Sequence, residues 1–409
     1  MVVSVPLRWL ASLASVVLAC TTAFVVLAAG PAQAATLQQV TSFGSNPGAL
    51  SMYSYRPDGL PSGAPLVVAL HGCTQDANTY FTNSGWRQLA DQRGFALVLP
   101  QQSTANNANK CFTWFDNADT ARGSGEAASI AAMVDHAVAS YGTAPSKVYV
   151  TGLSAGGAMS AVMLAAYPDK FAAGSVVAGI AYRCATTVSS AYSCMNPGVD
   201  KTPQAWGDLV RAAYPGYSGP RPRVAIWQGQ SDTTVAPANG VELRDQFTNV
   251  LGVSQTPSAS GSLDANTTWQ EFGAGAVRLT KITGMGHGTP VDPGTGPTQC
   301  GTAGAYFLDT VCSAYHDAAF FGLGGGGGST TTTSSTSTPP STTSTTTPPT
   351  STTTAACITS SNYDHVQAGR AYTSGGYALA VGSNQNLGLY NTFYTATLKQ
   401  SSPGYWEKC

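Results

Sequence analysis

The most regular pattern along the chain is a series of short apolar runs that alternate with segments of helical spacing. The strand-like runs occupy 66–70, 95–99, 148–151, 175–178, 224–227 and 277–282. Several are apolar at consecutive positions, which is typical of strands in a parallel sheet that helices cover on both faces. Apolar residues at helical spacing occupy 86–93, 125–141, 157–167 and 239–250. This alternation predicts an α/β fold with a central, mostly parallel sheet.

The N-terminal segment 1–34 has a different pattern. An arginine precedes a long apolar run that ends in Ala32-Gln33-Ala34, so we expect a signal peptide that is removed after Ala34. The run is also long enough for a membrane anchor, and 17–20 loosely matches a lipoprotein signal ending at Cys20. We favour cleavage after Ala34, because the apolar stretch continues past Cys20 and ends in Ala-x-Ala. The mature protein should then be secreted, with no membrane segment.

Towards the C-terminus the apolar pattern stops. We expect 35–323 to be one α/β catalytic domain, because a segment of that length can bury a full hydrophobic core. Residues 324–356 are almost entirely Gly, Thr, Ser and Pro, which predicts an extended linker. Residues 357–409 form a small module, in which a Cys357–Cys409 bridge would contribute about 3–4 kcal/mol. Its many tyrosines suit adsorption to a solid, or they simply fill its core.

Charge and cysteine content narrow the function. The net charge is −1 and only 10% of residues are charged. The chain therefore lacks the excess positive charge that binding to nucleic acid or to an anionic membrane requires. Without Cys20 the cysteine number is even, and an exported chain with even cysteines is expected to form disulfides. No Cys-x-x-Cys or His-x-x-x-His spacing supports a zinc site, so we expect no metal. We also expect a monomer. The spacing suggests the pairs Cys73–Cys111, Cys184–Cys194, Cys300–Cys312 and Cys357–Cys409.

A nucleophile elbow is the central chemical motif. The run 148–151 breaks into Gly152-Leu153-Ser154-Ala155-Gly156 and then into small, helix-compatible residues. This order of strand, sharp turn and helix would hold Ser154 Oγ out of the sheet. The N–H group of Ala155, at the start of the helix, would face a developing oxyanion. A tight Gly/Ser turn without catalytic function is the alternative.

The loop after 66–70 supplies the second expected oxyanion donor. His71-Gly72-Cys73 follows this strand, and we assign the donor to the Cys73 N–H, whose side chain a bridge to Cys111 would fix. The alternative is that His71 packs internally and Gly72 merely ends the strand. Trp114 and Phe115, beside Cys111, are candidates to contact substrate or to be ordinary core, and Trp227, at the end of 224–227, is a further candidate to contact substrate.

The remaining members of a catalytic triad also follow strands. Asp232 lies in the loop after 224–227, where a carboxylate can accept from a histidine Nδ1–H. His287 lies after 277–282 between glycines, which would let it reach Ser154. Asp208 and Asp292 are weaker candidates for the acid, because neither directly follows a strand. The order Ser154, Asp232, His287 is the one expected of an α/β-hydrolase.

These motifs resemble one family. Residues 71–75 (His-Gly-Cys-Thr-Gln), 152–159 (Gly-Leu-Ser-Ala-Gly-Gly-Ala-Met), 229–235 and 284–288 (Gly-Met-Gly-His-Gly) resemble the polyhydroxybutyrate depolymerase family of α/β-hydrolase esterases. That family is itself similar to secreted feruloyl and acetylxylan esterases. The resemblance implies a Ser154/His287/Asp232 triad, an oxyanion hole from the Cys73 and Ala155 N–H groups, no cofactor, and hydrolysis of carboxylic esters.

The sequence is compatible with two classes of function. One is a secreted ester hydrolase, whose partner is a polymeric or small ester: a polyhydroxyalkanoate, or alternatively a feruloyl or acetyl-xylan ester of plant cell walls. The other is a non-catalytic surface protein on a hydrolase scaffold, which the complete set Ser154, Asp232 and His287 disfavours. We expect loops over 184–217 to form the rim of the cleft, and no motif in them identifies the substrate.

Overall fold

The structure is a computed structural model that describes residues 35–324, 357–374, 377–389, 395–402 and 405–409. The expected signal peptide, Cys20 and nearly all of the expected linker therefore lie outside the described residues. The chain divides into two compact units, Met1–Ser329 and Thr330–Cys409.

A 10-stranded sheet forms the centre of the first unit, in the order β1-β2-β4-β3-β5-β6-β7-β10-β9-β8. The strands from β4 to β10 in this order run parallel, and both edges are antiparallel. The expected mostly parallel sheet is confirmed. The strands are β1 Gln38–Val40, β2 Ser51–Tyr55, β3 Leu66–Leu70, β4 Ala96–Gln101, β5 Val148–Leu153, β6 Ala173–Val177, β7 Arg223–Gly229, β8 Ala259–Ser262, β9 Thr267–Phe272 and β10 Val277–Ile282.

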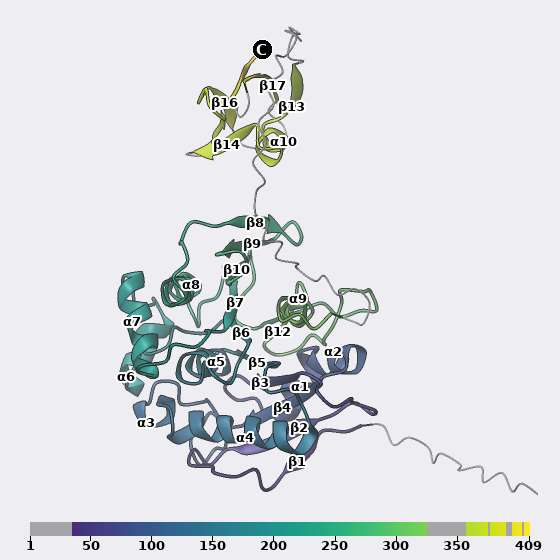
Figure 1. Ribbon diagram of the computed structural model, residues 1–409, viewed down its shortest axis with the longest axis vertical. Helices are drawn as coiled ribbons and strands as arrows, with labels where there is room; N and C mark the ends of the chain where they lie inside the picture. The colour runs from purple at the N-terminus through teal and green to yellow at the C-terminus, as the bar shows by residue number, and fades with distance from the viewer. Residues whose placement is uncertain (1–34, 325–356, 375–376, 390–394, 403–404) are drawn as a thin grey trace, which may run out of the picture. The chain divides into compact units, whose positions relative to one another are not determined.

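Helices cover both faces of the sheet, and Figure 1 shows α8 and α9 on opposite sides of β7 and β10. One buried cluster joins the sheet to α4, α5, α7 and α8, and the other joins it to α1, α2 and α9. Consecutive apolar residues in β3 serve both clusters, because neighbouring side chains of a strand point to opposite faces. The helices are α1 Ala77–Asn83, α2 Trp86–Arg93, α3 Asn117–Thr120, α4 Gly125–Tyr141, α5 Ala155–Ala166, α6 Val188–Met195, α7 Pro203–Ala213, α8 Ala238–Leu251 and α9 Ser313–Phe320.

The segment 184–217 differs from the expectation of loops. It contains the helices α6 and α7. Further along the chain, after the last strand of the central sheet, β11 Thr289–Val291 and β12 Phe307–Asp309 form a short parallel pair. Helix α7 begins with a Thr202 cap and Pro203, which are start signals for a helix. Within the described ranges, no helix is both long and apolar enough to span a bilayer.

Disulfides close several loops of the first unit and the whole second unit. Such bonds are typical of proteins from an oxidising compartment. In the structure they join Cys73 to Cys111, Cys184 to Cys194, Cys300 to Cys312 and Cys357 to Cys409.

The second unit is small and rich in strands. Its core consists of Ala371, Ala378, Ala380, Leu387 and Leu398. Tyr372 and Tyr405 are exposed, whereas Trp406 packs against this core, so the described aromatic side chains divide between surface and interior. Its elements are β13 Ile358–Ser361, α10 Asn362–Gln367, β14 Ala371–Ser374, β15 Tyr377–Ala380, β16 Asn386–Leu389, β17 Thr395–Ser402 and β18 Tyr405–Lys408.

Candidate active site

Ser154 stands at a strained turn between β5 and α5. Its backbone has φ 57° and ψ −117°, which a residue with a side chain rarely adopts. The turn is tight on both sides. A Cβ at Gly152 would lie 2.4 Å from the carbonyl oxygen of Gly156, and a Cβ at Gly156 would lie 2.5 Å from that of His71. Only glycine fits these two positions, and the crowding holds Ser154 at the apex.

Asp232 and His287 are joined by a hydrogen bond. The Nδ1–H of His287 donates to Asp232 Oδ2 at 2.7 Å. The other carboxylate oxygen, Oδ1, accepts from the backbone N–H groups of Thr234 and Val235, each at 2.8 Å. These contacts fix a buried carboxylate in one orientation. In the neutral imidazole whose proton is on Nδ1, Nε2 is the nitrogen that can act as a general base.

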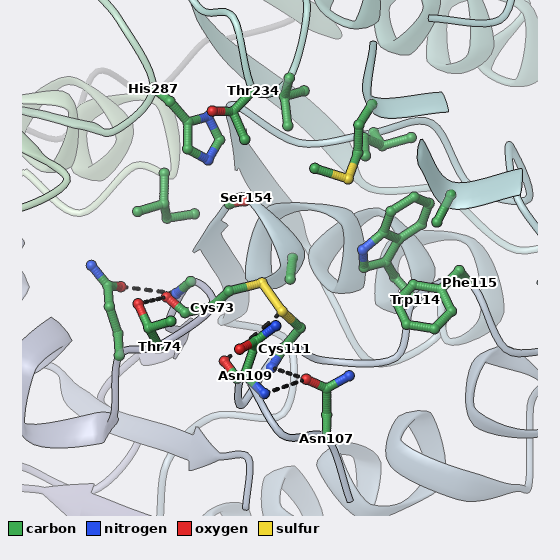
Figure 2. Close-up of a pocket in the computed structure, with 18 of the residues that line it drawn as sticks. Cys73, Thr74, Asn107, Asn109, Cys111, Trp114, Phe115, Ser154, Thr234 and His287 are labelled. Carbon is green, nitrogen blue, oxygen red and sulfur yellow. Dashed lines mark hydrogen bonds between the residues drawn. A yellow bond between two sulfur atoms is a disulfide. The ribbon is translucent and has the colours of Figure 1, made fainter. Parts of the chain in front are cut away.

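A cavity of about 430 Å³ brings the predicted groups together, with Ser154, Ala155, Cys73 and His287 in its lining. Figure 2 shows Ser154 between His287 on one side and the Cys73–Cys111 disulfide on the other. Among the described residues, no hydrogen bond joins Ser154 Oγ to His287. Catalytic hydrogen bonds are often long in a protein without substrate.

The expected oxyanion donors both lie at this cavity. The N–H groups of Cys73 and Ala155 have no hydrogen-bond acceptor among the described residues. Ala155 is the first residue of α5, where backbone N–H groups are free and the helix dipole favours negative charge. The two N–H groups are therefore available to a developing oxyanion.

His71 orients the loop that carries Cys73. The ring is fully buried, and burial lowers the pKa of His71 to about 4, so the imidazole is neutral at ordinary pH. Nδ1–H donates to the Gly72 carbonyl oxygen at 2.7 Å, while Nε2 accepts from the Gln102 N–H at 3.1 Å. Internal packing of His71 and a position of Cys73 at the cavity are therefore compatible and occur together.

Glu126 holds the segment that precedes two aromatic residues of the cavity lining. It is buried, and Oε2 accepts from the Thr113 N–H at 2.9 Å, while Oε1 accepts from the Thr113 hydroxyl at 2.7 Å and from Gln102. Burial raises the pKa of Glu126 to about 7. Trp114 and Phe115, which follow Thr113, line the cavity with their rings 5.4 Å apart. Figure 2 shows the two aromatic side chains together.

Trp227 does not belong to the cavity, and its expected contact with substrate is wrong. Side chains of β7 alternate between faces, and that of Trp227 points to the face covered by α9. Its indole is buried there and donates to Asp317 Oδ1 at 2.8 Å. The weaker acid candidates are engaged elsewhere: Asp208 with Arg211, and Asp292 with Gln299.

Several cavity residues were not predicted. Helix α6 contributes Val188, Ala191, Tyr192 and Met195, which share one face at spacings of three and four. Tyr306, with its ring 6.2 Å from that of His287, lies at the cavity as well. The helical spacing within 188–195 is a weak signal because it covers only 8 residues, and the place of Tyr306 depends on tertiary folding. Among the described residues, no group of three or more His, Cys, Asp or Glu could hold a metal ion.

A parallel sheet that ends in a serine elbow places the chain among the α/β-hydrolases, the class that includes many serine esterases. A solved structure supports this class: an acetyl xylan esterase from Aspergillus awamori is 32% identical, with a TM-score of 0.62, and matches 71% of this chain and 100% of its own.

Comparison with known families is more specific. Residues 50–272 match the family model described as Esterase PHB depolymerase. The chain is 54% identical to a poly(3-hydroxyalkanoate) depolymerase C of Paucimonas lemoignei over 73% of each chain. It is 41% identical to an acetylxylan esterase of Coprinopsis cinerea, over 63% of this chain and 70% of the other. The chain belongs to the PHB depolymerase esterase family and is a carboxylic ester hydrolase.

Proposed function

We propose that the protein is a secreted depolymerase of poly(3-hydroxybutyrate)-type polyesters. The observation that carries the proposal is the 54% identity to a poly(3-hydroxyalkanoate) depolymerase, against 41% and 39% to an acetylxylan and a feruloyl esterase. The cavity agrees with an uncharged polymer, because no Lys, Arg, Asp or Glu is among its lining residues in the described part of the chain.

The proposed mechanism is acyl transfer in two steps. His287 Nε2 takes the proton of Ser154 as Oγ attacks the ester carbonyl, and the bond to the alcohol oxygen breaks when His287 returns that proton to it. The Cys73 and Ala155 N–H groups stabilise the oxyanion, and Asp232 stabilises the imidazolium. Water activated by His287 then hydrolyses the acyl-enzyme, which restores Ser154 and releases a hydroxyacid or oligomer.

The remaining parts of the chain take supporting roles in this proposal. Residues 1–34 direct export, 324–356 space the two units, and 357–409 adsorbs the enzyme to its insoluble substrate. The exposed Tyr372 and Tyr405 support adsorption by the module.

The test measures acid released from a polyhydroxybutyrate suspension by the mature protein and by its Ser154→Ala variant. We expect Ser154→Ala to lower turnover by roughly 10⁶-fold. Ser160→Ala is a matched control, because this hydroxyl lies on the same helix but bonds to the Gly156 carbonyl oxygen and is outside the cavity. Methyl ferulate and acetylated xylan are tested in parallel. Ser154-dependent cleavage of these esters without release from the suspension would overturn the polyester assignment.

A further inference from the structure

Exposed apolar side chains gather around the cavity mouth. In the described part of 35–324, the large hydrophobic residues that are exposed are Val188, Tyr192 and Tyr306, at 58%, 69% and 46%. All three line the cavity that contains Ser154. Single exposed apolar residues are common anywhere on a protein surface, but their collection at one site marks a contact surface. We name Val188, Tyr192 and Tyr306 the apolar rim.

Helix α6 holds its part of the rim firmly. The helix starts with a capping box between Thr187 and Ser190, and the Cys184–Cys194 disulfide closes the segment around it. After its last turn, Asn196 Nδ2 donates to the Thr233 carbonyl oxygen at 2.7 Å, beside Asp232. The helix that carries these exposed side chains is thus held relative to the catalytic loop, which lowers the entropy cost of contact with a ligand.

Tyr306 reaches the rim from a separate segment. It lies within the loop closed by the Cys300–Cys312 disulfide, and its carbonyl oxygen accepts from the Thr289 N–H at 2.8 Å. Its φ is 64°, a left-handed conformation that is unfavourable for a residue with a side chain. Glycine would adopt this backbone without strain, so a tyrosine here suggests a role for the ring.

We propose that the apolar rim docks the catalytic unit onto the surface of an aliphatic polyester, beside its own active site. The inference rests on the proposed function. An aliphatic polyester carries no charge and no hydrogen-bond donors, and the rim is continuous with a cavity lined by no charged Lys, Arg, Asp or Glu among the described residues. A plant polysaccharide, covered with hydroxyl groups, would find only the two tyrosine hydroxyls as hydrogen-bond partners at the rim.

The experiment compares two rates of the full-length enzyme: acid release from a polyhydroxybutyrate suspension, and hydrolysis of soluble p-nitrophenyl butyrate. For the triple variant Val188→Ser/Tyr192→Ser/Tyr306→Ser we expect the ratio of the first rate to the second to fall at least tenfold, since each ring buried on the solid contributes about that factor. Tyr217→Ser is the control, because this half-buried tyrosine lies outside the cavity. A ratio equal to that of Tyr217→Ser overturns the proposal.

Adsorption provides a second readout that does not need turnover. In a Ser154→Ala background, depletion of protein from solution by polyester granules gives an apparent Kd, which the rim substitutions should raise about tenfold or more. If the wild-type enzyme releases no acid from the suspension, the proposed function fails, and this measurement alone decides on the rim. Weaker adsorption of the rim variant would then support docking, and unchanged adsorption would overturn it.

Discussion

The two oxygens of the Asp232 carboxylate have different partners, and this asymmetry makes Asp232→Asn an informative substitution. Oδ1 accepts from the N–H groups of Thr234 and Val235, while Oδ2 accepts from His287 Nδ1–H. An asparagine has one oxygen and one NH₂ group. Two backbone donors require the asparagine oxygen at the Oδ1 position, so the NH₂ group must face His287.

This orientation reverses the hydrogen bond to the imidazole. The asparagine NH₂ donates to Nδ1 of His287, so the ring carries its proton on Nε2 and cannot accept the proton of Ser154. The negative charge that stabilises the imidazolium is also lost. In a serine-protease triad the same substitution lowers kcat by about 10⁴-fold, which corresponds to about 5 kcal/mol of transition-state stabilisation. We expect a loss of that order here.

The assay is kcat and KM on p-nitrophenyl butyrate, together with thermal unfolding. Because asparagine keeps both backbone hydrogen bonds, Tm should stay within a few degrees of the wild-type value. Asp292→Asn is the matched control, since Asp292 bonds to Gln299 and lies outside the cavity. A kcat for Asp232→Asn within tenfold of wild type would refute the tautomer argument, and a large loss in Asp292→Asn would move the acid role there.

Two further substitutions test the supporting structure. Burial raises the pKa of Asp317 to about 7, so the wild-type protein should lose stability as the pH rises from about 4 to about 7. Asp317→Asn keeps an acceptor for Trp227 Nε1 but cannot ionise, so its Tm should fall less between pH 5 and pH 8; an identical fall would contradict this. Gly156→Ala places a Cβ 2.5 Å from the His71 carbonyl oxygen, and we expect kcat/KM to drop by about 10²-fold or more and Tm to fall by several degrees. Gly304→Ala, whose added Cβ would make only ordinary contacts, should change neither quantity, and a fully active Gly156→Ala would show that the turn can relax.

The sequence predicted the central sheet and the residues at its carboxyl edge for one physical reason. Strands buried on both faces have consecutive apolar residues, and parallel strands bring their carboxyl ends to one edge. Ser154, Asp232 and His287 each follow such a strand, so their assembly at one cavity could be expected. The role of each residue stays a prediction until the variants are measured.

Positions that depend on the face of a strand or on side-chain packing were not predictable in the same way. Trp227 ends a buried strand, but strand alternation directs it to the α9 face. Strands β2 and β9 lie next to the edge strands β1 and β8, and they contain serine, threonine and glutamine at positions that are only partly buried. Helix α6 has only 8 residues, a length over which helical spacing is a weak signal.

The cavity therefore combines two kinds of support. Its reacting groups follow strands of the sheet, whereas part of its wall comes from segments tied by disulfides: α6, which contains Cys194 of the Cys184–Cys194 bond, and Tyr306 between Cys300 and Cys312. A disulfide limits the conformations of such a segment without core packing, so its surface residues can change with little effect on the sheet. The chain is 39–54% identical to esterases named for feruloyl, acetylxylan and polyester substrates. Differences in substrate should then map to the wall segments rather than to the strand ends that carry the chemistry.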